Sequence, residues 1–388
     1  MPVYLEGMKG ANMNDTFAIV YARHGNPLLG DLIAHRCVSA LPLAGRFRTI
    51  DILLSNISHS GIRDVGVIMQ RNFQSLVEHI GSGDAWDLSS KSGGAALLTP
   101  FDQGLATGLY RGFGDALYAK RYYINRQRAK YCLILASDMV YRYDYSLLLE
   151  HHLETGADMT LLYSRELRLE QGDPTHLANL HIDDEGWVVG TDFEPVGPEG
   201  GCFNLGACIM DKDLMLRLVE DACAEGKYNF VTDVIEPATG RYKIAALEHK
   251  GYAGRLTTVK SYFDMSCDLL DPQIRDEVFE AQGSVYTRIM DAPPVHYNLG
   301  CEVENSVFGN GCEISGRVVG SVVFRGVTIE PGADVENCVI MQDSHISAGA
   351  HLRNAIIDKD VFVGPGARLV GTPTQVAVVR KGTIVEGL

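Results

Sequence analysis

The chain has 388 residues, of which 46% are hydrophobic and 21% charged, and its formal net charge is −15. This length is sufficient for two hydrophobic cores, and the composition is that of a globular protein. The acidic balance argues against binding to nucleic acid or an anionic membrane, which needs a mainly basic surface, but leaves room for a small basic pocket.

The nine cysteines lie in apolar runs and form no close Cys-x-x-Cys pair. This pattern favours buried thiols in a reducing cytoplasm over disulfides or metal ligands. The first residues include Glu6, Lys9 and Asp15 without an apolar core, so we expect no secretory signal. No stretch approaches the roughly 18 apolar residues of a transmembrane helix. We therefore expect a cytoplasmic protein with no membrane or nucleic-acid partner.

Between Thr16 and about Asp268, short apolar runs alternate with longer stretches of helical periodicity. The runs FAIVYA, DVGVIMQ, YCLILAS and MTLLYS have the length of strands, and FGDALYAKRYYINRQR and YSLLLEHHLETG lie between some of them. Strands that are apolar on both faces and separated by helices indicate a mostly parallel sheet covered on both sides. Such sheets bind ligands at the carboxyl ends of their strands, so the loops after FAIVYA and YCLILAS are the candidate site.

After Pro293 and Pro294 the sequence repeats with a period of 17 residues. A fixed period with three short apolar steps indicates a β-helix with three strands per coil. We expect an α/β domain over residues 1–285 and the β-helix over residues 286–388. The aligned apolar columns are Ile329, Ile346 and Val363; Val318, Val335, Leu352 and Leu369; and Val323, Ile340 and Ile357, and the aligned glycines are Gly332, Gly349 and Gly366.

The repeat alone leaves a second interpretation open. Hexapeptide acyltransferases are built on such a β-helix and use a histidine as the catalytic base, for which His345 and His351 are the candidates. Both histidines lie in regular coil sequence, and no long inserted loop interrupts the repeat. A β-helix whose end or flank docks a partner domain or subunit is therefore the favoured interpretation.

Four segments of the chain carry a family resemblance. They are AGRFRTIDILLSNISHSGIRDVGVIMQ, LYRGFGDALY, YCLILASDMVYRYDYSLLLEHHLETGADMT and FNLGACIM. In this order they resemble segments of the ADP-glucose pyrophosphorylase (glucose-1-phosphate adenylyltransferase) family. The resemblance implies a Rossmann-like nucleotidyltransferase (GT-A-like) domain followed by a left-handed parallel β-helix. It also implies a reaction of ATP with glucose 1-phosphate, giving ADP-glucose and pyrophosphate for glycogen or starch synthesis. Such a reaction depends on positioning, on cations near the phosphates and on Mg²⁺ held by carboxylates.

The loop after FAIVYA departs from the family pattern L-A-G-G-x-G-T-R-L, which a second motif, R-A-K-P-A, follows. Glycines let backbone N–H groups approach the triphosphate, and the arginine and lysine supply a cationic clamp. Because these features are lost together, we expect no intact catalytic site. The substitutions are Arg23 and His24 for the paired glycines, Asn26 for the third glycine, Leu28 for the arginine, Val38 for the lysine and Ser39 for the proline.

The metal and sugar-phosphate motifs are also incomplete. Asp138 keeps one carboxylate of the family's Mg²⁺ site, but Arg255 stands at the position of the second. A cation at the position of a metal ligand repels Mg²⁺, so we expect poor binding of this ion, which the family uses. The family's Glu-Lys-Pro motif is reduced to Glu194 and Pro195 without the lysine.

Some family positions persist, and two interpretations remain open for each group of them. The first group is a residual nucleotide or sugar-phosphate site, unless its members are kept only to support strand ends and helix starts. The second group matches arginines that line an allosteric pocket for phosphorylated metabolites, unless its members simply pair with carboxylates. The first group is Gln70, Tyr110, Arg111, Gly112, Asp115, Glu194 and Gly206; the second is Arg36, Arg48 and Arg380, with Lys381 beside them.

Together these features resemble the GlgD-type subunit of the bacterial enzymes of this family, and the resemblance implies a non-catalytic, regulatory role. Such a subunit would associate with a catalytic homologue, as a hetero-oligomer that we expect to be a tetramer, and alter the affinity of that partner for substrate or effector. Two alternatives remain. One is a slow but active adenylyltransferase in which Asp138 holds the metal alone, and the other is a stand-alone sensor of sugar phosphates or nucleotides.

Overall fold

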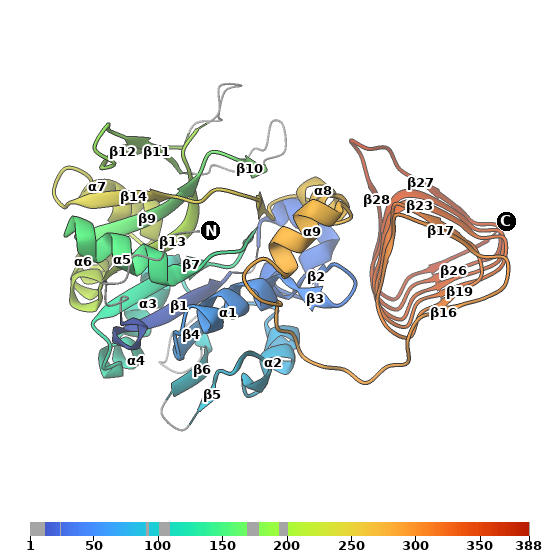
Figure 1. The fold of residues 1–388 in the computed structure, drawn as a ribbon, viewed down its shortest axis with the longest axis horizontal. Coiled ribbons are helices and arrows are strands. Elements are labelled where there is room, and N and C mark those ends of the chain that lie inside the picture. The colour runs from blue at the N-terminus through green and yellow to red at the C-terminus, as the bar shows by residue number, and fades with distance from the viewer. Residues whose placement is uncertain are drawn as a thin grey trace, which may run out of the picture.

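The structure is a computed structural model that describes residues 12–23, 25–90, 93–100, 109–168, 178–193 and 201–387. It contains an α/β domain and a triangular prism of short strands, joined by an extended segment (Figure 1). Within these residues no helix is long and apolar enough to cross a membrane.

The α/β domain is built on one large sheet with the strand order β12-β11-β13-β7-β1-β4-β6-β5, in which β13 also pairs with β9 and β9 with β14. Strands β7, β1, β4 and β6 are parallel to one another, and β13 runs antiparallel between β7 and β9. This confirms the predicted, mostly parallel sheet. The strands are β1 (Thr16–Ala22), β4 (Asp64–Met69), β5 (Ser89–Ser90), β6 (Gly93–Leu98), β7 (Tyr131–Ala136), β9 (Met159–Ser164), β11 (Asn179–Ile182), β12 (Val188–Asp192), β13 (Phe203–Asp211) and β14 (Ile244–Glu248).

Helices cover both faces of this sheet. Successive residues of β1 point to opposite faces, so Ala18 and Val20 pack with α1, α2 and α5, while Phe17 and Ile19 pack with α3, α4 and α6. This is why the strand is apolar throughout. The helices are α1 (Thr49–His59), α2 (Gln74–Ile80), α3 (Phe113–Ala119), α4 (Arg121–Arg126), α5 (Tyr145–Thr155), α6 (Lys212–Ala224), α7 (Glu236–Ala238), α8 (Val259–Asp268) and α9 (Pro272–Phe279).

The prism is the predicted β-helix, and its coils stack in the predicted register. Ile329 pairs with Ile346 and Ile346 with Val363, and the two other aliphatic columns align in the same way. Gly332 and its equivalents have φ near +70°, for example 74° at Gly332, a corner conformation that glycine adopts without steric cost. His345 and His351 lie on the outside of the prism, where they pair with Glu330 and Asp334.

Each side of the triangle in Figure 1 is one stack of strands. The first side contains β16 (His296–Tyr297), β19 (Glu313–Ile314), β22 (Thr328–Ile329), β24 (His345–Ile346), β26 (Phe362–Val363) and β29 (Ile384–Val385). The other two sides share β23 (Asp334–Ile340) and β25 (His351–Ile357), which pass around a corner. One of them adds β17 (Glu302–Glu304), β20 (Arg317–Val319) and β27 (Arg368–Val370), and the other adds β18 (Val307–Phe308), β21 (Val322–Val323) and β28 (Ala377–Val379).

The side with β28 packs against the α/β domain (Figure 1). The contact is an apolar core that joins Val322, Val339 and Ile356 of the prism to Leu32 and Tyr262 of the α/β domain. Leu32 belongs to η2 (Pro27–Ile33), the 3₁₀-helix that follows β1 and carries the altered loop. The loop at which the family binds triphosphate is therefore anchored directly to the β-helix.

Candidate functional site

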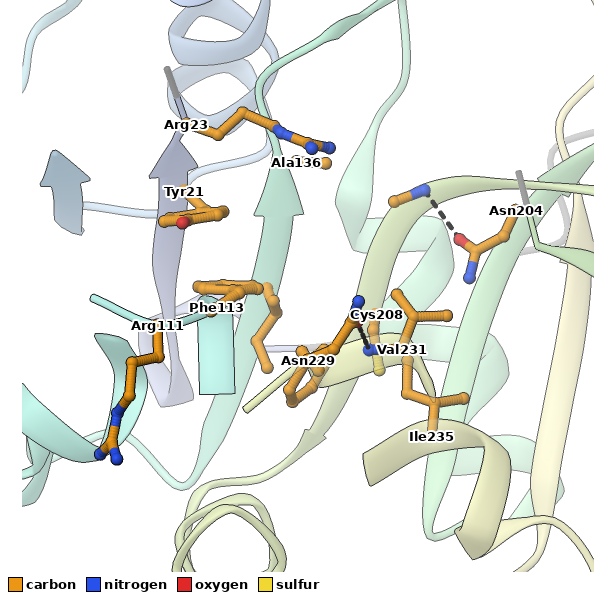
Figure 2. A pocket seen from close by; sticks show the side chains of 14 residues that line it. Tyr21, Arg23, Arg111, Phe113, Ala136, Asn204, Cys208, Asn229, Val231 and Ile235 are labelled. Atoms are coloured by element: carbon orange, nitrogen blue, oxygen red, sulfur yellow. Dashed lines mark hydrogen bonds between the residues drawn. The ribbon is translucent and has the colours of Figure 1, made fainter. Parts of the chain in front are cut away.

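A cavity of about 280 Å³ lies where β1, β7 and β13 approach α3 and the segment 229–235. This is the position that the strand pattern predicts for a ligand, since it adjoins the carboxyl ends of β1 and β7. Figure 2 shows the lining side chains. They are Tyr21, Arg23, Arg111, Gly112, Phe113, Ile134, Ala136, Asn204, Gly206, Cys208, Asn229, Phe230, Val231 and Ile235.

The loop after β1 is closed by local packing. Asn26 caps η2 by accepting a hydrogen bond from the N–H of Leu28 at 2.9 Å. Val38 is fully buried, and a Cβ added at Gly25 would lie 3.3 Å from the Cβ of Val38. Leu28, at the position of the family's arginine, is exposed to solvent. An apolar contact thus occupies the position at which the family pattern has a lysine, and Leu28 supplies no cation. His24 lies outside the described residues.

Two arginines flank the remaining metal-type carboxylate. Arg23 Nη1 lies 3.4 Å and Arg255 Nε 3.5 Å from Oδ2 of Asp138. Strand β15 (Ala253–Arg255) runs antiparallel to β8 (Met139–Tyr141) and pairs Arg255 with Met139, which brings the arginine beside Asp138. Side chains Asp138 and Arg255 are 6% and 10% exposed, so solvent screens their charges poorly, whereas Arg23 is 43% exposed.

This arrangement does not fit Mg²⁺. The ion needs a set of oxygen ligands, and here two guanidinium groups adjoin one carboxylate. In the described part of the chain, no three His, Cys, Asp or Glu side chains are grouped so that they could hold a metal ion. No catalytic step through a metal can be derived from these residues.

Two serines support the floor of the site. The hydroxyls of Ser39 and Ser137 lie 2.7 Å apart, and Ser137 Oγ donates to the carbonyl of Tyr21 at 2.8 Å. Both serines are buried. They stand where the family patterns have a proline and a glycine, so each replacement provides a hydrogen-bond partner for the other, as burial of a hydroxyl requires.

Aromatic side chains form one wall of the cavity. The rings of Tyr21 and Phe113 stack at 4.3 Å between centroids, and Phe113 also contacts Phe230 at 5.4 Å. Tyr21 and Phe113 stand at the leucine of L-A-G-G and the threonine of W-Y-R-G-T-A-D-A. Burial raises the pKa of Tyr21, and its hydroxyl donates to Gln70 Oε1 at 3.3 Å. The aromatic pair therefore arises from two departures from the family pattern.

Gln70, Tyr110, Arg111 and Asp115 bond to one another or to their neighbours. Gln70 donates to the carbonyl of Tyr110 at 2.7 Å, and Asp115 accepts from the backbone N–H and the guanidinium of Arg111, each at 2.9 Å. The guanidinium of Arg111 also lies over the ring of Tyr228 at 3.7 Å, directed away from Tyr21 and Phe113 in Figure 2.

The glycines of the predicted site have steric reasons to persist. A Cβ at Gly112 would lie 2.3 Å from the carbonyl oxygen of Tyr228, and one at Gly206 would lie 2.5 Å from the Cβ of Ala136. Gly206 also has φ +70°. Glu194 lies outside the described residues. Among the described members of the predicted nucleotide site, the cavity is lined by Arg111, Gly112 and Gly206.

A second group of charges lies between the α/β domain and the β-helix. Arg36 is buried and donates to Oδ1 of Asp358 at 2.7 Å, and Arg48 donates to the carbonyl of Ser75 at 2.5 Å. Burial, then Arg48 and Arg36, lower the pKa of Lys359 to about 7, with a smaller contribution from Arg325. Burial likewise lowers the pKa of Arg48. We call Arg36, Arg48, Arg325 and Lys359 the interdomain basic cluster.

The cluster differs in membership from the predicted allosteric set. It contains Arg36 and Arg48, but Arg380 pairs with Asp31 at 2.8 Å and Lys381 with Asp360 at 3.5 Å. No motif of the sequence indicates Arg325 and Lys359, which lie in two different coils and resemble ordinary surface residues in sequence. The 17-residue repeat carries a signal for them, because Arg325 and Lys359 occupy equivalent positions in it. Each follows an apolar column on the side of the prism that meets the α/β domain.

Comparison with known proteins identifies relatives of both parts of the chain. A family model described as nucleotidyl transferase matches residues 31–271, and one described as GlmU-like, C-terminal hexapeptide matches residues 295–383. The glucose-1-phosphate adenylyltransferase of Thermomicrobium roseum is 32% identical over 354 residues, covering 86% of this chain and 82% of that protein. The enzymes so named from Bacillus cereus and Halalkalibacterium halodurans are each 30% identical, covering 78% and 79% of this chain and 80% of each protein.

Proposed function

Because the chain belongs to the ADP-glucose pyrophosphorylase family of nucleotidyltransferases, we propose that it is the non-catalytic, GlgD-type regulatory subunit of such an enzyme. The observation that carries the proposal is the position of Arg23 and Arg255 beside Asp138, at 3.4 and 3.5 Å from one carboxylate oxygen. A divalent cation at this carboxylate would face two positive charges, one of them nearly buried.

Loss of the phosphate-binding loop supports the same proposal. Transfer of an adenylyl group needs positive charge at the phosphates and a backbone that approaches them closely. Here Val38 is buried in apolar packing and Leu28 is exposed, so neither provides this charge. The nucleotidyl transferase match begins at residue 31, so the altered positions from Arg23 to Leu28 lie outside the matched segment, while Val38 lies within it.

We propose that the chain acts on a catalytic homologue within a hetero-oligomer, in bacterial glycogen synthesis. The coupling would reside in contacts that differ between two states of the assembly. Helix η2 contacts the β-helix through Leu32 and through the ion pair of Asp31 with Arg380. A change in these contacts would couple the two parts of the chain.

We further propose that a phosphorylated metabolite binds at the interdomain basic cluster. Arg36 donates to the carboxylate of Asp358 there, and the lowered pKa of Lys359 reflects both burial and repulsion by Arg48, Arg36 and Arg325. A phosphate group would relieve this repulsion and favour the charged form of Lys359. Binding of such an effector should therefore be accompanied by uptake of protons near neutral pH.

The test is an assay of pyrophosphate release from ATP, glucose 1-phosphate and Mg²⁺. We expect no turnover by this chain alone, and an altered rate or effector response when it is mixed with a catalytic homologue from the same genome. Robust turnover by the chain alone would contradict the proposal. If neither turnover nor any effect on the homologue is observed, a stand-alone sensor becomes the better explanation.

A further inference from the structure

The cavity between β1, β7 and β13 is lined mainly by apolar side chains. Tyr21 and Phe113 stack with an angle of 8° between their rings, and Phe230 continues this aromatic wall. Val231 and Ile235 add aliphatic surface to the lining (Figure 2). The volume of about 280 Å³ lies at the lower end of the range for ligand pockets, which suits a compact ring system rather than a nucleotide.

Both cations that line the cavity already adjoin a carboxylate. Arg23 lies 3.4 Å from Oδ2 of Asp138, and the guanidinium of Arg111 donates to Asp115 at 2.9 Å. The guanidinium of Arg111 also covers the ring of Tyr228, outside the cavity. A phosphate group inside the cavity would therefore lack the paired cations that usually hold this anion in proteins.

The two other titratable side chains of the described lining are neutral near pH 7. Burial raises the pKa of the Cys208 thiol and that of the Tyr21 hydroxyl. An anionic ligand would thus exchange its hydration for a mostly apolar wall without spare positive charge, which costs free energy. The lining favours an uncharged ligand.

One buried polar side chain of the lining has a free donor. Asn204 is only 6% exposed, and its Oδ1 accepts a hydrogen bond from the N–H of Gly206 at 2.7 Å. Because only the amide oxygen can accept this bond, the orientation of the side chain is fixed, and Nδ2 is directed away from Gly206 into the cavity (Figure 2). Nδ2 forms no hydrogen bond with any part of the chain that the structure describes. A ligand that accepts from Nδ2 would satisfy a buried donor.

From these observations we propose that the cavity binds an uncharged, planar ring compound that bears a hydrogen-bond acceptor, such as a carbonyl oxygen. The ring would pack against Tyr21 and Phe113, and the acceptor would face Nδ2 of Asn204. A hexose fits this lining less well, because its several hydroxyl groups each need a partner that aromatic and aliphatic carbon does not supply. The cavity thus keeps the place of a ligand pocket in the fold but takes a different class of ligand. Binding of such a compound does not depend on the regulatory role, so either can fail alone.

A matched pair of probes tests the class of ligand. Acetophenone is planar and uncharged with one carbonyl acceptor, whereas benzoate has the same ring and a similar size but a negative charge. In saturation-transfer NMR titrations of the full chain, we expect acetophenone to bind with a Kd of about 1 mM or less, and benzoate at least about tenfold more weakly. Glucose, glucose 1-phosphate and ATP with Mg²⁺ should not displace acetophenone. Absence of acetophenone binding, displacement by any of these three compounds, or equal binding of benzoate would overturn the proposal.

Two variants locate the bound probe. Asn204→Asp keeps an oxygen for the N–H of Gly206 but removes the donor, and it should weaken acetophenone binding about tenfold. Val231→Phe fills part of the cavity and should abolish binding, whereas Val189→Phe, at an exposed residue of β12 outside the cavity, should leave it unchanged. Thermal unfolding of each variant shows whether it is folded, and the comparison of probes on the wild-type chain needs no variant. If acetophenone binds equally to the wild-type chain and to both folded cavity variants, it lies elsewhere and the proposed site is wrong, while the assay of pyrophosphate release still decides the regulatory role.

Discussion

At the residue scale, the decisive feature is that guanidinium groups adjoin Asp138. An aspartate at a position where the family pattern has one would by itself suggest a surviving metal site, but Arg23 and Arg255 lie 3.4 and 3.5 Å from its carboxylate oxygen. When one partner of a buried ion pair is removed, the other is left as an uncompensated charge, and the folded state is destabilised. The carboxylate of Asp138 therefore has a structural partner in Arg255.

This role predicts unequal effects of the two arginines on stability. Arg255→Met should lower the free energy of unfolding by about 2–3 kcal/mol, because it leaves the buried Asp138 with one solvent-exposed partner. Arg23→Met, at a side chain that is 43% exposed, should cost less than about 1 kcal/mol. Urea denaturation of both variants measures the difference. Equal and small effects would show that Asp138 does not depend on Arg255.

At the element scale, the altered loop after β1 packs as part of an apolar core. Val38 packs within the apolar core that also contains Leu29 and Leu32 of η2 and reaches the β-helix. Gly25 remains a glycine, with φ +118° and a Cβ position only 3.3 Å from Val38. The loop thus has a packing function that resists restoration of the family's residues.

Restoration of the cationic clamp should accordingly fail at one position and be tolerated at the other. Val38→Lys should destabilise the chain by about 3 kcal/mol or more, because it buries an ammonium group in an apolar core. Leu28→Arg, at an exposed position, should change stability by no more than about 0.5 kcal/mol. Thermal unfolding of the two single variants measures this. A stable Val38→Lys variant would mean that the core opens easily and that the clamp can be rebuilt.

At the scale of the whole molecule, the two parts of the chain meet through an apolar core that contains an imbalance of charge. Arg36 has a buried carboxylate partner in Asp358, but Arg48 and Lys359 add positive charge nearby. Repulsion between these buried positive charges destabilises the folded state. We therefore expect either an anionic ligand at the cluster or a dependence of stability on pH. Such imbalances are a common feature of functional sites.

The pH dependence has a definite sign. The pKa of Lys359 falls from an ordinary value of 10.5 to about 7 in the folded chain. Between these values the unfolded chain binds more protons, so stability should rise with pH above 7, by at most about 1.4 kcal/mol per pH unit, and level off below 7. Urea denaturation between pH 7 and pH 9 should show this slope. Lys359→Met should remove it, and Lys381→Met, at an exposed residue paired with Asp360, should not.

The sequence by itself determined those features that depend on local pattern. The 17-residue period and its glycines specify strands and corners, because each coil repeats the same local geometry and contacts only its neighbours. Loss of the loop glycines and of the cationic clamp could also be read directly from the chain, since the family pattern is contiguous there. These features set the fold and raised the expectation that catalysis is lost.

Only the tertiary structure decided what replaced the lost chemistry. The contacts of Asp138 with Arg23 and Arg255 join segments more than one hundred residues apart, and they depend on how β15 pairs with β8. Likewise, Arg36 meets Asp358 and Lys359 only because the prism packs against η2. Sequence periodicity determines secondary structure, whereas the charge and exposure of a site depend on the packing of distant segments.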